Sequence, residues 1–108
     1  MQLYANPNRP DHQTNCAAFE TFMRRFEWVK FFQPNPEKSP WHVQAKIKTD
    51  NGYVLVLNFW PHKLKGQYFA DDGESGGTYE GVDGLRDMMA AAIDDCRDRE
   101  ADFDLIEG

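Results

Sequence analysis

The segment that decides the fold is residues 41–60, WHVQAKIKTDNGYVLVLNFW. From 41 to 48 apolar and polar side chains alternate, which is the period of a half-buried β-strand. The DNG triplet at 50–52 is typical of a hairpin turn, and residues 53–60 supply a return strand. The segment therefore predicts an antiparallel hairpin.

The register of this hairpin follows from matching its apolar faces. A two-residue turn would pair Lys48 with Leu55, which mixes the two faces, whereas a three-residue turn with a left-handed Gly52 keeps them apart. The second register predicts three apolar pairs: Val43 with Phe59, Ala45 with Leu57, and Ile47 with Leu55. The opposite face then carries His42, Gln44, Lys46, Lys48, Val54, Val56, Asn58 and Trp60.

Helices are predicted on both sides of this hairpin in the chain. Residues 1–13 are rich in Asn and Pro and are expected to form an irregular lead-in, after which Thr14 or Asn15 caps a helix that ends near residue 27. Its apolar stripe has helical spacing: Phe19, Phe22, Met23 and Phe26. A second helix follows residue 81, with a longer stripe formed by Val82, Leu85, Met88, Met89, Ala92, Ile93 and Cys96.

The remaining segments complete one domain over residues 1–108. Short strands are predicted at 28–32 and 66–70, and loops at 33–40 and 71–81, the first with three prolines and the second with four glycines. Residues 100–108 form an acidic tail that is expected to fray. The predicted fold is α+β: a small antiparallel sheet of three or four strands, flanked by an N-terminal and a C-terminal helix in α-β-β-β-α order, with both helices on one face.

Catalytic and metal-binding signatures are not apparent in the chain, which is predicted not to be an enzyme. Ser39 and Ser75 lie in loops without a motif, and Cys16 and Cys96 are interpreted as reduced structural thiols on apolar helix positions. His12 precedes Cys16 by four residues, but a second close ligand pair for zinc does not follow. We therefore expect no catalytic residue, no cofactor and no metal ion.

The N-terminus lacks the pattern of a signal peptide, and no apolar run reaches the roughly 18–20 residues that span a bilayer. With two cysteines and no disulfide framework, the chain is predicted to be cytoplasmic and to have no membrane partner.

Charge is distributed unevenly along the chain, whose net charge is −6. Residues 1–70 carry nine Lys and Arg against five Asp and Glu, whereas residues 71–108 carry thirteen acidic residues against three arginines, a net charge of −10. In the second helix four aspartates fall within an arc of about 60°: Asp83, Asp87, Asp94 and Asp98. Together with the adjacent Asp95 they form what we call the acidic stripe.

Asp94 and Asp98 are about 6 Å apart along the helix axis, which is comparable to the spacing of phosphates along a nucleic-acid strand. The stripe could thus imitate a nucleic acid for a partner rich in Lys and Arg, or it could be an ordinary solvent-facing helix side. A second candidate surface is the aromatic and basic face of the sheet, where stacking and phosphate contacts would bind single-stranded nucleic acid. Its residues are His42, Lys46, Lys48, Trp60, Lys63 and Lys65.

Two resemblances bear on function. The order helix–three strands–helix resembles the double-stranded-RNA-binding domain, but residues 81–85 lack the lysines with which that family begins its last helix. The segment 58–61, NFWP, followed by KGQ at 65–67, is similar to an Asn-aromatic-aromatic-Pro…Gly-Lys-x-Gln segment of small phage-encoded proteins, although residues 62–64 depart from that pattern. The second resemblance implies a phage or prophage accessory protein, a class that includes anti-CRISPRs and other inhibitors of host defence.

These observations predict a non-enzymatic interaction protein. The leading hypothesis is a phage-type, anti-CRISPR-like inhibitor, acting in the host cytoplasm, whose acidic helix and tail occupy the basic surface of a host nucleic-acid-binding complex as a DNA mimic. The alternative hypothesis is a small nucleic-acid-binding module that uses the sheet face. The sequence leaves the oligomeric state, the target and the source open.

Overall fold

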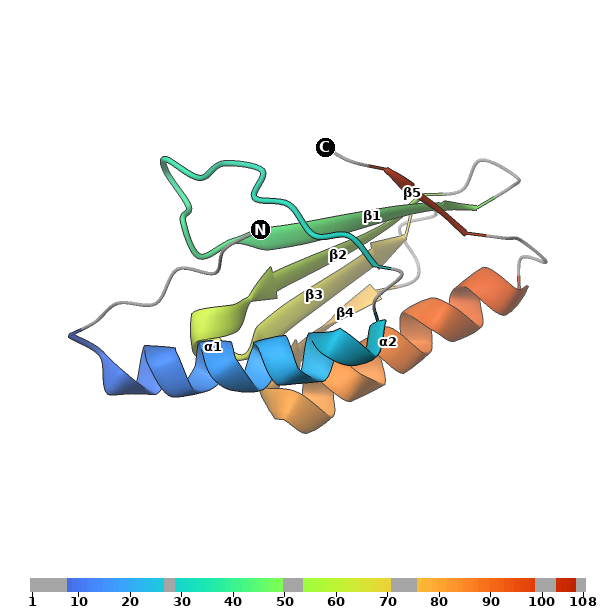
Figure 1. The fold of residues 1–108 in the computed structure, drawn as a ribbon. Coiled ribbons are helices and arrows are strands. Elements are labelled where there is room, and N and C mark those ends of the chain that lie inside the picture. Colours follow the sequence, from blue (N-terminus) through green and yellow to red (C-terminus); the bar gives the residue numbers. More distant parts are fainter. Residues whose placement is uncertain (1–7, 27–28, 50–53, 71–75, 99–102, 107–108) are drawn as a thin grey trace.

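The computed structural model of the chain describes residues 8–26, 29–49, 54–70, 76–98 and 103–106 (Figure 1). For residue 49 and residues 95–98 and 103–106 it describes the backbone and not the side chain. Every sheet contact and core residue given below belongs to these ranges.

The fold consists of one antiparallel sheet and two main helices. The strands are β1 (Val43–Thr49), β2 (Val54–Trp60), β3 (Lys65–Ala70), β4 (Gly76–Glu80) and β5 (Phe103–Ile106), and the helices are α1 (Pro10–Met23) and α2 (Gly81–Asp98). Short 3-10 turns follow α1, as η1 (Arg24–Phe26), and β2, as η2 (Pro61–Lys63). The strands lie in the order β4-β3-β2-β1-β5, and each neighbouring pair is antiparallel. The predicted α+β class is confirmed.

Both helices cover the same face of the sheet, as predicted (Figure 1). The core between the layers contains the inward residues of the first two strands, which are at most 1% exposed, and two helix clusters, Phe19 with Phe22 and Leu85 with Met88 and Met89. We call the other side of the sheet the outer face. Because successive side chains of a strand point to opposite faces, the strand side chains that point away from this core lie on the outer face.

The predicted hairpin register is confirmed. Val43 pairs with Phe59, Ala45 with Leu57 and Ile47 with Leu55. All six side chains are 1% exposed or less, so this register places the apolar side chains of these three pairs in the core. The turn at 50–53 that was used to choose the register lies outside the described residues.

The first helix begins earlier than predicted, because Pro10 occupies its first turn rather than an irregular lead-in. Proline suits this position, since its fixed φ is helical and its missing N–H would be unpaired there in any case. Thr14 and Asn15 are consequently inside the helix and do not cap it. Arg9 is the N-cap residue and makes no side-chain capping hydrogen bond.

Two segments predicted as irregular form strands instead. Residues 76–80, predicted as part of a loop, are β4, and Gly76 fits there because a Cβ on it would lie 2.5 Å from Tyr68 O. Residues 103–106 of the acidic tail form β5, which pairs with residues 46–49 of β1. Backbone pairing with an open strand edge stabilises both segments: residues 76–80, GGTYE, have little apolar content, and residues 103–106, FDLI, lie within a segment that was predicted as an acidic tail. The order therefore differs from helix–three strands–helix of the double-stranded-RNA-binding domain.

The strand predicted at 28–32 is reduced to one bridge, in which Phe32 pairs with Gln44 on the edge of β1. Residues 27 and 28 lie outside the described ranges. The chain turns directly from β4 into α2 at Gly81, whose φ of +75° is a left-handed value that glycine adopts without strain. Its N–H donates to Leu64 O at 2.8 Å, which ties the start of α2 to the end of η2.

Candidate binding surfaces

The described part of the acidic stripe is exposed. Asp83, Asp87 and Asp94 point away from the core on α2, and the side chain of Asp83 is 94% exposed. Arg86 lies 3.5 Å from Asp83, so one of these charges is partly offset on the helix itself. Asp95 and Asp98 belong to α2, but their side chains lie outside the described residues.

The stripe is held on a firmly packed helix. Leu85 and Met88 are fully buried and Met89 is 1% exposed, as the apolar stripe predicted. These side chains fix the rotation of α2 on the sheet, so the opposite side of the helix is presented to solvent in one orientation. Asp83, Asp87 and Asp94 therefore lie in a row along the exposed side of α2.

The outer face brings together most residues of the second predicted surface. His42 and Trp60 stack with their rings 5.0 Å apart and 11° from parallel. The buried Asn58 fixes this arrangement, because its Oδ1 lies 2.7 Å from His42 Nε2 and accepts a hydrogen bond from Gln44 Nε2 at 2.8 Å. A polar cross-strand network thus holds an aromatic pair in place on an otherwise open face.

The lysines of this surface are spread over its length. Lys46 lies on β1 with its Nζ 5.8 Å from the centre of the Phe32 ring, a cation–π distance. Lys48 is exposed two residues further along β1. Lys65 pairs with Glu80 at 3.2 Å, which offsets its charge, and Lys63 is exposed in η2 beside the sheet. Lys46 and Lys48 are thus the cations of this face whose charge is not offset by an ion pair in the described structure.

The sequence reasoning missed an apolar component of the outer face. Phe69 on β3 is 47% exposed and lies opposite Val56 of β2, which itself is opposite Lys46. A single exposed ring is common on protein surfaces, and Phe69 is of interest here because it shares the outer face with Val56 and Lys46. Its position could have been found from the alternation of residues 66–70, which places 69 on the face away from the buried 68 and 70.

A second group that the sequence did not reveal is a cluster of three buried or half-buried rings, which we call the histidine–tryptophan cluster: His12, Trp41 and His62. The two histidine rings meet edge to face at 4.9 Å, and the Trp41 ring is 5.0 Å from His62. Asn15 of α1 contacts η2 through a hydrogen bond that its Nδ2 donates to His62 O at 2.8 Å. Neither histidine Nδ1 has a hydrogen-bond partner among the described residues, although both atoms are buried.

His12 and Cys16 of α1 have different surroundings in the structure. His12 packs against His62 from η2, and Cys16 is a separate buried thiol whose pKa is raised by burial and by the nearby Glu20 carboxylate. A raised thiol pKa reduces the nucleophilic thiolate. In the described ranges no group of three or more His, Cys, Asp or Glu side chains is placed to hold a metal ion. Cys96 lies outside the described side chains.

Burial also affects His62. It lowers the pKa of the imidazole to about 4, and positive charges on His12, Lys63 and Arg9 act in the same direction. The ring is consequently neutral at physiological pH and packs as a neutral side chain, and its Nδ1 has no hydrogen-bond partner among the described residues.

Comparison with protein-family models, with curated proteins and with solved structures gives no match. Within the described residues neither helix combines the length and the hydrophobicity that crossing a membrane requires. Inference about function therefore rests on the surfaces themselves.

Proposed function

We propose that the chain is a non-enzymatic interaction protein that binds, through the acidic stripe, a protein surface which otherwise binds nucleic acid. The observation that supports this most is the exposure of Asp83, Asp87 and Asp94 on one side of a helix whose other side buries Leu85, Met88 and Met89. Together with the resemblance of residues 58–67 to small phage proteins, it favours an anti-CRISPR-like inhibitor of a host defence complex, acting in the host cytoplasm.

Electrostatics give the expected strength of this contact. Exposed charge pairs contribute a few tenths to about 1 kcal/mol each and are screened by salt. Acidic surfaces of this kind mainly accelerate and orient association with a basic partner. The complex should therefore weaken as salt increases, and it should be displaced by nucleic acid that competes for the same basic groove.

The experiment uses two variants of equal net charge. Asp87→Asn with Asp94→Asn removes two charges from the stripe, and Glu20→Gln with Glu37→Gln removes two exposed charges elsewhere. Both pairs leave the Asp83–Arg86 contact intact, and circular dichroism checks that each variant is folded. A tagged wild-type chain captures its partner from bacterial lysate, and the affinity of all three proteins for that partner is then measured at two salt concentrations.

We expect the stripe variant to bind about 5- to 30-fold more weakly at low salt, which corresponds to about 1–2 kcal/mol, while the control variant binds like wild type. Excess duplex DNA or RNA should release the captured partner. Equal losses for the two variants would mean that only net charge matters. A partner that nucleic acid does not displace would rule out mimicry.

The outer face supports a second candidate function, a module that binds single-stranded nucleic acid. The specific observation is the combination of the His42–Trp60 stack with the exposed Phe69 ring and with Lys46 and Lys48 on the outer face. Aromatic rings stack on bases and lysines contact phosphates, without sequence preference.

Fluorescence anisotropy with a labelled oligothymidylate separates the two candidates. The sheet-face module binds the oligonucleotide, and Phe69→Ser or Lys48→Gln weakens that binding, whereas Asp87→Asn does not. A nucleic-acid mimic repels the oligonucleotide and gives no change in anisotropy with wild type or any of these variants.

A further inference from the structure

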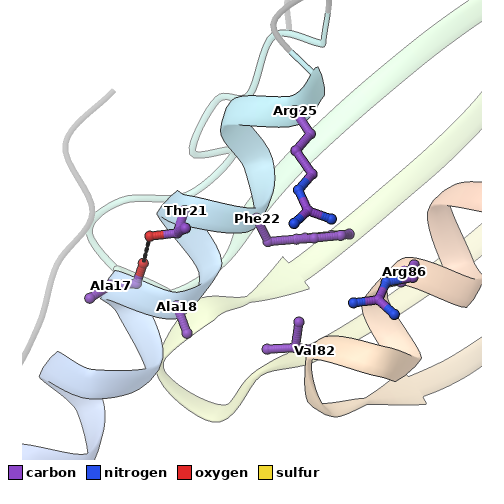
Figure 2. Close-up of a pocket in the computed structure, with 7 residues that line it drawn as sticks. All are labelled: Ala17, Ala18, Thr21, Phe22, Arg25, Val82 and Arg86. Atoms are coloured by element: carbon purple, nitrogen blue, oxygen red, sulfur yellow. Dashed lines mark hydrogen bonds between the residues drawn. The ribbon is translucent and has the colours of Figure 1, made fainter.

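A pocket of about 350 Å³ lies between α1 and α2, on the side of the helices away from the outer face (Figure 2). Its apolar lining comes from Ala17, Ala18 and Phe22 of α1 and from Val82 of α2. Figure 2 shows Ala18 and Val82 facing each other across it, with the Phe22 ring beside them. The two alanines leave the space that a larger side chain at the helix crossing would fill, and a volume near 300 Å³ or more is that of a small-molecule site.

Two arginines stand at one end of this pocket. Arg25 comes from η1 and Arg86 from α2, and Figure 2 shows both guanidinium groups extending toward the space around the Phe22 ring from opposite helices. Arg86 has Asp83 at 3.5 Å, whereas no carboxylate of the described residues lies within ion-pair distance of Arg25. Two positive groups converging beside an apolar cavity are complementary to one anionic group placed between them.

The other polar group in the lining is already satisfied. Thr21 Oγ1 donates to Ala17 O at 3.0 Å, which Figure 2 marks as a dashed line. Arg25 is therefore the polar group of the lining without an ion-pair partner among the described residues, and Arg86 would share its guanidinium between Asp83 and a ligand. The composition resembles that of small-molecule sites in general: an apolar body of the pocket and a few placed polar groups that fix orientation.

We propose that the interhelix pocket binds a small organic anion, with its apolar body against Ala18, Phe22 and Val82 and its anionic group between Arg25 and Arg86. A carboxylate and a phosphate monoester share the chemistry that a guanidinium pair recognises. The proposal does not rest on the proposed function, because the lining contains none of the stripe aspartates, although Arg86 lies 3.5 Å from Asp83 of the stripe.

The test uses 2-naphthoate, its neutral analogue 2-naphthamide, 2-naphthyl phosphate and inorganic phosphate, titrated into the full chain by isothermal calorimetry and by thermal shift. We expect 2-naphthoate or 2-naphthyl phosphate to bind at least about tenfold more tightly than 2-naphthamide, and inorganic phosphate to bind more weakly than either anion. The stronger of the two naphthyl anions identifies the anionic group that the pocket prefers.

Variants localise the binding. Arg25→Gln and Arg86→Gln should each weaken the anion about 5- to 10-fold without affecting 2-naphthamide. Arg24→Gln is the matched control, since it removes the same charge from the adjacent exposed residue, which does not line the pocket, and it should change affinity less than about twofold. Ala18→Leu fills the cavity and should abolish binding of both naphthyl anions while the far-ultraviolet dichroism stays native.

Several results would overturn the proposal. Equal affinity for 2-naphthoate and 2-naphthamide would remove the role of the arginines, and equal affinity for inorganic phosphate would remove the role of the apolar body. Binding that survives in a folded Ala18→Leu variant would place the site elsewhere. Absence of heat or thermal shift with millimolar 2-naphthoate and 2-naphthyl phosphate would show that the pocket takes no ligand of this class.

Discussion

Replacing His62 with Phe is expected to make the folded state more resistant to acid. The ring is 7% exposed, and its Nδ1 has no hydrogen-bond partner among the described residues. Burial lowers the pKa of His62 from 6.5 to about 4, with His12, Lys63 and Arg9 adding to the effect and Asp11 opposing it. The histidine therefore takes up its proton at a much lower pH in the folded than in the unfolded chain.

The size of the effect follows from these two pKa values. Above pH 6.5 the imidazole is neutral in both states, and its contribution to stability is fully present. As the pH falls from 6.5 to 4 the unfolded chain binds a proton that the folded chain does not, so the free energy of unfolding decreases. The gap of about 2.5 pKa units corresponds to up to about 3 kcal/mol below pH 4, and to up to about 2 kcal/mol at pH 5.

The assay is urea unfolding at pH 7 and pH 5, followed by circular dichroism, for wild type, His62→Phe and His62→Gln. Phe keeps the ring volume beside Trp41, and Gln keeps a polar group that does not titrate. Both variants should lose less stability than wild type on going from pH 7 to pH 5, by up to about 2 kcal/mol, whatever their stability at pH 7. If both lose as much as wild type, the buried imidazole does not govern the acid response and the reasoning fails.

Two further predictions concern the contact of the sheet with α2. A Cβ on Gly66 would lie 2.8 Å from Leu85 Cδ2 and from Met88 Cε, so Gly66→Ala should destabilise the fold by about 1–3 kcal/mol in urea unfolding. When Gly66→Ala is combined with Met88→Ala, the loss of stability should be smaller than the sum of the two single losses. Leu85→Ala should cost about 2–5 kcal/mol by the same measurement because Leu85 is fully buried, whereas the exposed Asp87→Ala should change stability by less than about 0.5 kcal/mol; similar values for the two would contradict the assigned orientation of α2.

The parts of the fold that the sequence predicted are those in which one face must be buried. In the hairpin a shift of one residue would move every apolar side chain to the outer face, so the pattern from 43 to 59 specifies its own register. The same holds for α2, where Leu85, Met88 and Met89 repeat at helical spacing. Residues 76–80 of β4 have little apolar content and gave no such signal, and residues 103–106 of β5 were missed because the residues before them are acidic. Backbone pairing to an existing strand stabilises both.

The sites were predictable only where their residues are close in sequence. The acidic stripe and the His42–Trp60 face follow from spacing within one helix and one hairpin. The histidine–tryptophan cluster joins residues 12, 41 and 62, and no local period connects them. The interhelix pocket is harder still to predict from sequence, because it exists where the small side chains at 17 and 18 do not fill the space between the helices.

The placement of charge indicates how the two candidate surfaces differ in use. Lys46 and Lys48 lie on the outer face, whereas Asp83, Asp87 and Asp94 lie on the far side of α2, with the sheet and the core between the two groups. A basic partner is consequently attracted to α2 and repelled by the outer face, and an anionic partner is guided the opposite way. One flat partner surface cannot contact both surfaces, so for a given partner either the stripe variant or the sheet variant should change affinity, but not both. Added salt should weaken binding at either surface. Loss of affinity in both variants for one partner would require a partner that wraps around the edge of the sheet.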